Sequence, residues 1–164
     1  VLRTVAETTR TTGSVPTPAE LEDILDASFF LPTANKPAHR QMKEAARRLV
    51  ATYAVEHESD LHRVWETERP FELHLDGVTV SGRADVILDR EGGVPTALAI
   101  VDYKTSTSGD VADHALQLQV YADAGRREGL DVAAPDPAYE IVVGGKGTHG
   151  GSVQLVGRYP DGPA

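Results

Sequence analysis

The stretch "ALAIVDYKT", residues 97–105, joins an apolar run to an acid and a base. The run from Ala97 to Val101 is continuous, which is typical of a strand that is covered on both faces of a sheet. Asp102 and Lys104 follow at positions i and i+2, so their side chains share one face of the strand, roughly 6–7 Å apart. An isolated Asp-x-Lys is most simply a structural ion pair at a strand end. The surrounding sequence is therefore needed to distinguish a structural ion pair from a catalytic site.

The residues before this strand predict a β-hairpin. Apolar and polar residues alternate from 71 to 75, and Asp76-Gly77 is a strong signal for a two-residue turn. The second strand of the hairpin carries Asp85. Because neighbouring strands of this kind pair antiparallel, we expect Asp85 to lie near Asp102.

Two carboxylates that converge in a partly buried place repel each other unless a proton or a divalent cation lies between them. A hard cation held there by oxygen ligands would lower the pKa of a bound water and make it a nucleophile. Lys104 would orient that water or stabilise the charge that develops on a phosphate. Asp85, Asp102 and Lys104 therefore form the candidate site for metal-assisted phosphate chemistry.

Helices are predicted before and after these strands. Thr17 is placed as an N-cap, with Pro18 at the first helical position and Glu20 completing a capping box. Pro37 opens a longer helix. The inward face of that helix is predicted from three- to four-residue spacing and comprises Met42, Ala45, Ala46, Leu49, Val50 and Tyr53.

The order of elements predicts one α/β domain with a central mixed sheet flanked by helices. Residues 1–57 are expected to be helical, and residues 61–159 to form a β-β-β-α-β-β core. An amphipathic helix is expected over 111–129, and two final strands over 138–145 and 152–159. The first residue falls within a predicted helix, so we expect the 164 residues to be part of a longer chain.

Composition limits the classes of function. The absence of cysteine excludes disulfides, thiolate catalysis, Cys-ligated zinc and an iron–sulfur cluster. No apolar run is long enough for a membrane span, and no signal-peptide pattern opens the chain, so a cytoplasmic location is expected. The formal net charge of −9 counts against a stand-alone nucleic-acid binder, which usually carries a basic face. It does not exclude chemistry on DNA that cations or another domain help to bind.

Three motifs in order resemble the RecB-like branch of the PD-(D/E)XK nuclease superfamily. A strand with Gly-x-x-Asp is followed by a strand with Asp-x-Lys and a helix with Gln-x-x-x-Tyr, and a Glu-x-Pro-Phe strand precedes them. In this chain they are Gly82-Arg83-Ala84-Asp85, Asp102-Tyr103-Lys104, Gln117 to Tyr121, and Glu68 to Phe71. The resemblance implies a restriction-endonuclease-like fold with α-β-β-β-α-β order.

The resemblance also implies roles for individual residues. Asp85 and Asp102 would bind Mg²⁺ or Mn²⁺, together with the backbone carbonyl of Tyr103, and Lys104 would be the catalytic lysine. Gln117 and Tyr121, one helical turn apart, would line the site and position the lysine or the DNA. Without the resemblance, this last pair reads equally well as a core tyrosine beside a solvated glutamine.

The expected function is that of a metal-dependent deoxyribonuclease, with DNA as substrate and a helicase domain as partner in DNA repair or recombination. Relatives carry a further metal-binding histidine on an early helix, which we expect upstream of Val1. Glu66 and Glu68 are its possible substitutes, although their strand positions favour structural roles. One alternative is a nuclease-like domain that binds DNA or other subunits without cutting. Another is an unrelated two-carboxylate hydrolase such as a glycosidase, which the low aromatic content of 5% disfavours.

Overall fold

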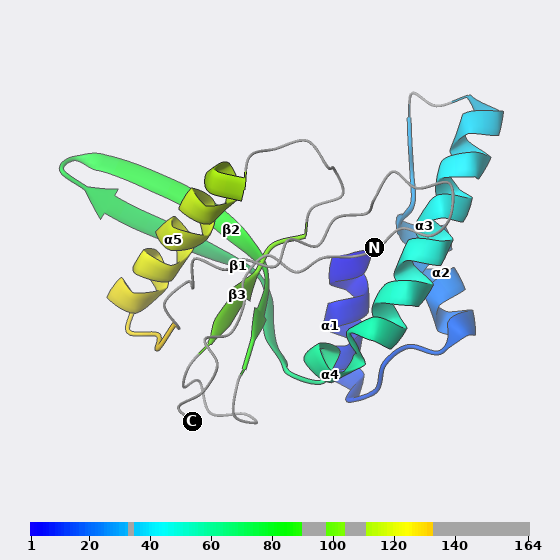
Figure 1. Cartoon of the computed structure of the whole chain (residues 1–164), viewed down its shortest axis with the longest axis horizontal. Coiled ribbons are helices and arrows are strands. Elements are labelled where there is room, and N and C mark those ends of the chain that lie inside the picture. Colours follow the sequence, from blue (N-terminus) through cyan, green and yellow to red (C-terminus); the bar gives the residue numbers. More distant parts are fainter. Residues whose placement is uncertain (33–34, 90–97, 104–110, 133–164) are drawn as a thin grey trace.

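The computed structural model describes residues 1–32, 35–89, 98–103 and 111–132 (Figure 1). Its elements in chain order are α1 Leu2–Thr12, α2 Pro18–Ser28, α3 Lys36–Glu56, α4 Glu58–Leu61, β1 Val64–Leu75, β2 Val78–Leu88, β3 Ala99–Val101 and α5 Val111–Arg127. Among the described residues, none of the helices combines the length and apolar character needed to cross a bilayer.

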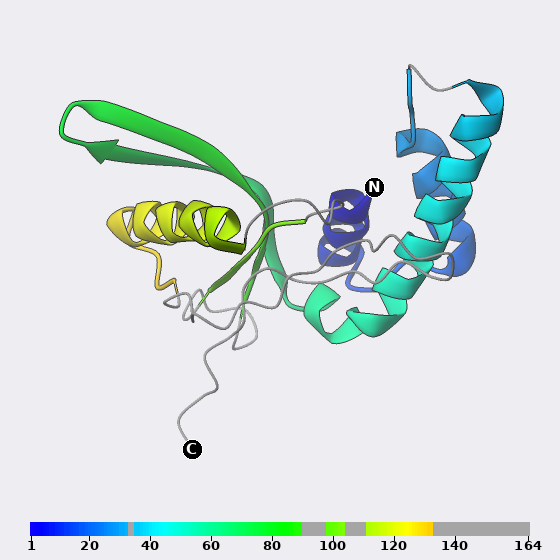
Figure 2. The same ribbon diagram turned by 45° about the horizontal axis from the view of Figure 1, so that its top comes forward.

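The three described strands form one antiparallel sheet in the order β1-β2-β3. Helices α1–α4 lie on one side of this sheet and α5 lies on the other, as Figures 1 and 2 both show. This is the α/β class with the α-β-β-β-α order that the sequence predicts. The two expected final strands, 138–145 and 152–159, lie outside the described residues.

Two groups of apolar side chains form the core, one on each side of the sheet. The group on the side of α1 and α3 contains Val5, Ala6, Leu21, Val50, Tyr53, Ala54, Leu61, Val64, Val86, Leu88, Ala99 and Val101. The group under α5 contains Phe71, Leu73, Ala84, Ile87, Leu98, Ile100, Leu118, Tyr121, Ala122, Ala124 and Val132. All three residues of β3 are buried between these groups, as the continuous apolar run predicts.

The predicted hairpin is confirmed. Leu75 pairs with Val78 across a turn in which Asp76 and Gly77 both have positive φ, 46° and 86°. These are the left-handed conformations that a two-residue turn requires and that Asp and Gly supply. Within β1, Glu68 also has a positive φ, 54°, which breaks the regular pleat in the middle of the long strand.

The helix signals are confirmed in detail at α2 and α3. Thr17 accepts a hydrogen bond from the backbone of Glu20, and the Glu20 carboxylate accepts one from the backbone of Thr17. Asn35 caps α3 by accepting from Ala38 N–H at 3.0 Å, and Pro37 lies in its first turn. Both caps satisfy backbone donors that a helix start leaves without intrahelical partners.

Two expectations for the helical part are wrong. Residues 58–61 form the short helix α4, so the core that was expected from residue 61 has its first strand only from Val64. The inward face of α3 is confined to its C-terminal half, because Met42 is 52% exposed and Ala45 is also exposed. The N-terminal half of α3 projects beyond α1, which lies between α3 and the sheet (Figures 1 and 2), so its apolar positions lie outside the core.

Candidate active site

Strand pairing brings Asp85 and Asp102 together. Val86 pairs with Val101 in the antiparallel register of β2 and β3, so the next pair outward is Asp85 opposite Asp102. Asp102 is only 5% exposed and the side chain of Asp85 is 20% exposed. The backbone N–H of Tyr103 donates to Asp85 Oδ2 at 2.7 Å, which fixes the carboxylate of one strand against the backbone of the other.

The surroundings of Asp85 favour its neutral form. Burial raises the pKa of this carboxyl above its ordinary value. The Tyr103 N–H and the Arg3 guanidinium act in the opposite sense, while the charge of Asp102 and a hydrogen bond with it raise the pKa further. The charge of Asp102 therefore disfavours ionisation of Asp85, which is the repulsion that the sequence predicts for two converging carboxylates.

An arginine from α1 reaches the same place. Arg3 forms an ion pair with Glu68, and its Nε lies 3.5 Å from Asp85 Oδ1. Glu68 stands opposite Asp85 when the β1–β2 register is followed, and its positive φ directs its side chain away from the regular strand pattern. A guanidinium thus connects two acidic side chains on neighbouring strands. Sequence analysis did not identify Arg3, because no local pattern marks it.

Tyr103 ties the strand that bears Asp102 to α3. Its hydroxyl is hydrogen-bonded to that of Tyr53, and the two rings meet edge-on with centroids 5.6 Å apart. Burial raises the pKa of both tyrosines above the ordinary value, so both stay protonated and able to share this hydrogen bond. Tyr53 was expected only as a core residue. Through its hydroxyl, Tyr53 also holds the segment that follows β3 and contains Asp102.

The Gly-x-x-Asp and Gln-x-x-x-Tyr motifs interlock. The Tyr121 ring lies against Gly82, so that a Cβ at that position would stand 2.8 Å from the Tyr121 hydroxyl oxygen and overlap the ring. The hydroxyl accepts from Arg83 N–H at 3.3 Å and from Gln117 Nε2 at 2.9 Å. The ring also stacks on Phe71, with centroids 5.8 Å apart.

The structure therefore assembles the predicted residues in two groups. Asp85, Asp102 and the Tyr103 backbone meet at the junction of β2 and β3, while Gln117 and Tyr121 grip β2 a few residues earlier. Tyr121 is 6% exposed, so its side chain is buried. Lys104 lies outside the described residues.

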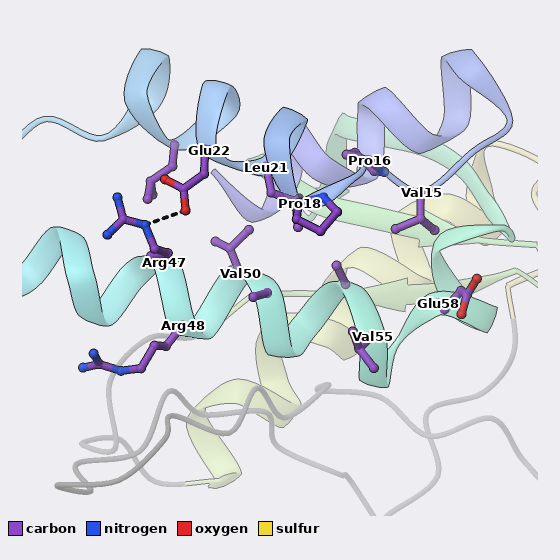
Figure 3. Close-up of a pocket in the computed structure, with 13 residues that line it drawn as sticks. Val15, Pro16, Pro18, Leu21, Glu22, Arg47, Arg48, Val50, Val55 and Glu58 are labelled. Carbon is purple, nitrogen blue, oxygen red and sulfur yellow. Dashed lines mark hydrogen bonds and ion pairs between the residues drawn. The ribbon is translucent and has the colours of Figure 1, made fainter.

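An apolar hollow elsewhere does not carry this chemistry. A pocket of about 540 Å³ lies between α2 and α3, and its walls include Val15, Leu21, Val50 and Val55 (Figure 3). Asp85, Asp102 and Glu68 do not line this pocket. Its walls are mainly apolar side chains, and no pair of carboxylates converges among them.

Comparison with known families agrees with the fold and the motifs. A family model described as the PD-(D/E)XK nuclease superfamily matches residues 2–158. The chain belongs to the PD-(D/E)XK nuclease superfamily. The expected restriction-endonuclease-like α/β fold is confirmed by this membership together with the described elements. A comparison with curated proteins gave no match.

Members of this superfamily are typically nucleases that depend on divalent metals such as Mg²⁺. The carboxylates of Asp85 and Asp102 suit such an ion, since carboxylate oxygens are ligands that Mg²⁺ prefers. In the part of the chain that the structure describes, no three His, Asp or Glu side chains gather closely enough to enclose a cation. Mg²⁺ usually keeps several waters and is often bound through only one or two carboxylates, so the pair of Asp85 and Asp102 fits such an ion.

Proposed function

We propose that this chain is a metal-dependent deoxyribonuclease of the RecB-like branch. In this proposal it acts as an exonuclease beside a helicase domain, in the same polypeptide or complex, during DNA repair or recombination. The observation that carries the proposal is the placement of Asp85 opposite Asp102, where burial and mutual repulsion raise the pKa of Asp85. Two carboxylates this close destabilise the fold when both are ionised, and a divalent cation between them would remove that repulsion.

Each residue then has a defined task. Asp85, Asp102 and the carbonyl of Tyr103 would hold Mg²⁺ or Mn²⁺, which supplies an activated water and stabilises charge on the phosphate. Lys104 would orient that water or neutralise the developing charge. Tyr121, through Arg83 N–H, and Gln117, through Tyr121, would hold β2 in the register that presents Asp85.

Cleavage of labelled DNA by the full chain with Mg²⁺ tests the proposal. Asp85→Asn and Asp102→Asn should each lower the rate by roughly a hundredfold or more, the scale expected when a group that stabilises the transition state is lost. Asp76→Asn is the matched control, because it removes one charge from the same hairpin at a turn position that Asn tolerates. Near-normal cleavage by either site variant would contradict the assignment.

A second candidate is a nuclease-like domain that binds DNA or another subunit without cutting it. The observation that favours it is Arg3, whose guanidinium already supplies positive charge between Glu68 and Asp85. If the wild-type chain binds DNA but does not cleave it with Mg²⁺ or Mn²⁺, and Arg3→Gln does not start cleavage, this candidate replaces the first.

A further inference from the structure

The N-terminal half of α3 is strongly basic in an otherwise acidic protein. Residues 36–48 contain five Lys or Arg and one Glu, which gives a net charge of +4, while the whole chain has −9. The remainder of the chain therefore carries −13. Such a concentration of positive charge on one helix is the electrostatic feature that nucleic-acid-binding surfaces show.

The basic residues of this segment differ in how they are neutralised. Lys43 pairs with Asp26 at 2.6 Å, and Arg47 pairs with Glu22 at 2.5 Å, an interaction visible in Figure 3. These ion pairs join α3 to α2, so the positive charges of Lys43 and Arg47 have a structural role. Lys36 and Arg40 are exposed, and neither forms an ion pair with another described residue.

An exposed aromatic ring stands beside these two cations. Phe30 is 76% exposed, an unusual environment for a side chain of this size. It lines a hollow of about 490 Å³ together with Leu31, Pro32, Lys36, His39 and Arg40.

A ring contact fixes His39, one of the residues that line the hollow. The His39 ring meets Phe29 edge-on, with ring centroids 5.4 Å apart. This contact joins the C-cap of α2 to the first turn of α3. Phe30 and Arg40 each follow directly after one member of this ring contact, Phe29 and His39, which places them on neighbouring parts of the surface.

We propose that this hollow binds single-stranded nucleic acid, with Phe30 stacking on a base and Lys36 and Arg40 contacting phosphates. Single-strand sites combine aromatic platforms with cations that follow the backbone, and both are present here. An acidic protein segment would satisfy Lys36 and Arg40 but would leave the exposed face of Phe30 unexplained. The inference rests on the proposed function, since it gives the nuclease a second point at which to hold its strand.

Fluorescence anisotropy with a labelled oligothymidylate tests the site in buffer that contains EDTA, where no cleavage occurs. Phe30→Ala should weaken binding by roughly five- to a hundredfold, the range for one lost base–aromatic stack. Lys36→Ala and Arg40→Ala should each reduce the slope of log K against log salt concentration by about 0.7, the value for one phosphate contact on a single strand. Arg48→Ala is the matched control, because Arg48 is exposed on the same helix but lies 3.5 Å from Glu44.

The readouts separate this inference from the proposed nuclease function. Hydrolysis of the small ester bis(p-nitrophenyl) phosphate should be the same in Phe30→Ala and wild type, because so small a substrate does not reach the hollow. Wild-type affinity and salt slope in all three variants would overturn the inference while leaving nuclease activity intact. Equal competition by poly-glutamate and by oligothymidylate would also overturn it, in favour of an acidic protein partner. Phe30-dependent binding without any hydrolysis would contradict only the nuclease function.

Discussion

The ring of Tyr121 occupies the space in which residue 82 would carry its side chain, and residue 82 is a glycine. The hydroxyl of the same tyrosine accepts a hydrogen bond from Arg83 N–H on β2 at 3.3 Å. Asp85 follows only two residues later on that strand. Helix α5 thus holds β2, the strand that carries Asp85, and the Gly-x-x-Asp and Gln-x-x-x-Tyr motifs pack against each other.

Gly82→Ala should destabilise the protein by about 1–3 kcal/mol, because the added methyl group overlaps the Tyr121 ring and overpacks a closed contact. Urea denaturation measures the loss. In a Tyr121→Ala background the same substitution should cost little, since the ring that it meets is gone. Ser81→Ala, at the exposed neighbouring position, is the control for alanine in this strand. An equal cost of Gly82→Ala in both backgrounds would show that the ring contact is not its cause.

The sequence predicted the hairpin, the buried third strand and the two motifs, but not the packing of Tyr121 against Gly82 and Arg83. Asp76-Gly77, the Thr17 capping box and the apolar run before Asp102 each act over a few residues, so their geometry follows from local chemistry. Pairing of the two strands then places Asp85 opposite Asp102 once the hairpin register is known.

The contacts that were missed all join distant parts of the chain. Arg3 reaches Asp85 from α1, and Tyr53 meets Tyr103 across 50 residues of sequence. Neither contact has a periodic or local signal, because each depends on how α1 and α3 dock on the sheet. The inward face of α3 was predicted too long for the same reason. The spacing of apolar residues gives the direction of the apolar stripe, but the positions of α1 and α2 decide which part of that stripe is buried.

Asp85→Asn should raise stability at neutral pH in metal-free buffer. A carboxyl whose pKa is raised on folding favours the folded state only while it is protonated, so its ionisation destabilises the protein as pH rises above its ordinary value of 3.8. Asparagine retains an oxygen that can accept from Tyr103 N–H and carries no charge to repel Asp102. We expect Tm to rise by about 2 °C or more at pH 7, and the gain to disappear below pH 3.8.

Thermal denaturation at pH 3 and pH 7, with EDTA present, measures this difference. Asp76→Asn again serves as the control, since the turn carboxylate is exposed and stands apart from the pair. A clear loss of stability in Asp85→Asn at pH 7 would mean that the carboxylate is held as a structural ion pair with Arg3.

Tyr53→Phe should destabilise the protein by about 1–3 kcal/mol, because it leaves the Tyr103 hydroxyl without its partner in a largely apolar environment. The double variant Tyr53→Phe/Tyr103→Phe should recover much of this loss, since both polar groups are then removed. Chemical denaturation of the two single variants and the double variant gives the coupling energy directly. Additive losses would show that the two hydroxyls do not depend on each other.

Arg3→Gln should tighten the binding of Mn²⁺ by up to about fivefold. The guanidinium of Arg3 lies 3.5 Å from Asp85 Oδ1 and also pairs with Glu68, so a divalent cation must compete with a positive charge already present. The side chain of Arg3 is 49% exposed, and an ion pair so open to water is worth at most about 1 kcal/mol, which sets the limit on the gain. Titration calorimetry with Mn²⁺ measures the affinity, and Arg10→Gln is the control because Arg10 pairs with Glu7 on the same helix. Weaker Mn²⁺ binding in Arg3→Gln than in Arg10→Gln would mean that Arg3 supports the metal site by orienting Asp85, and that its charge is not the competitor.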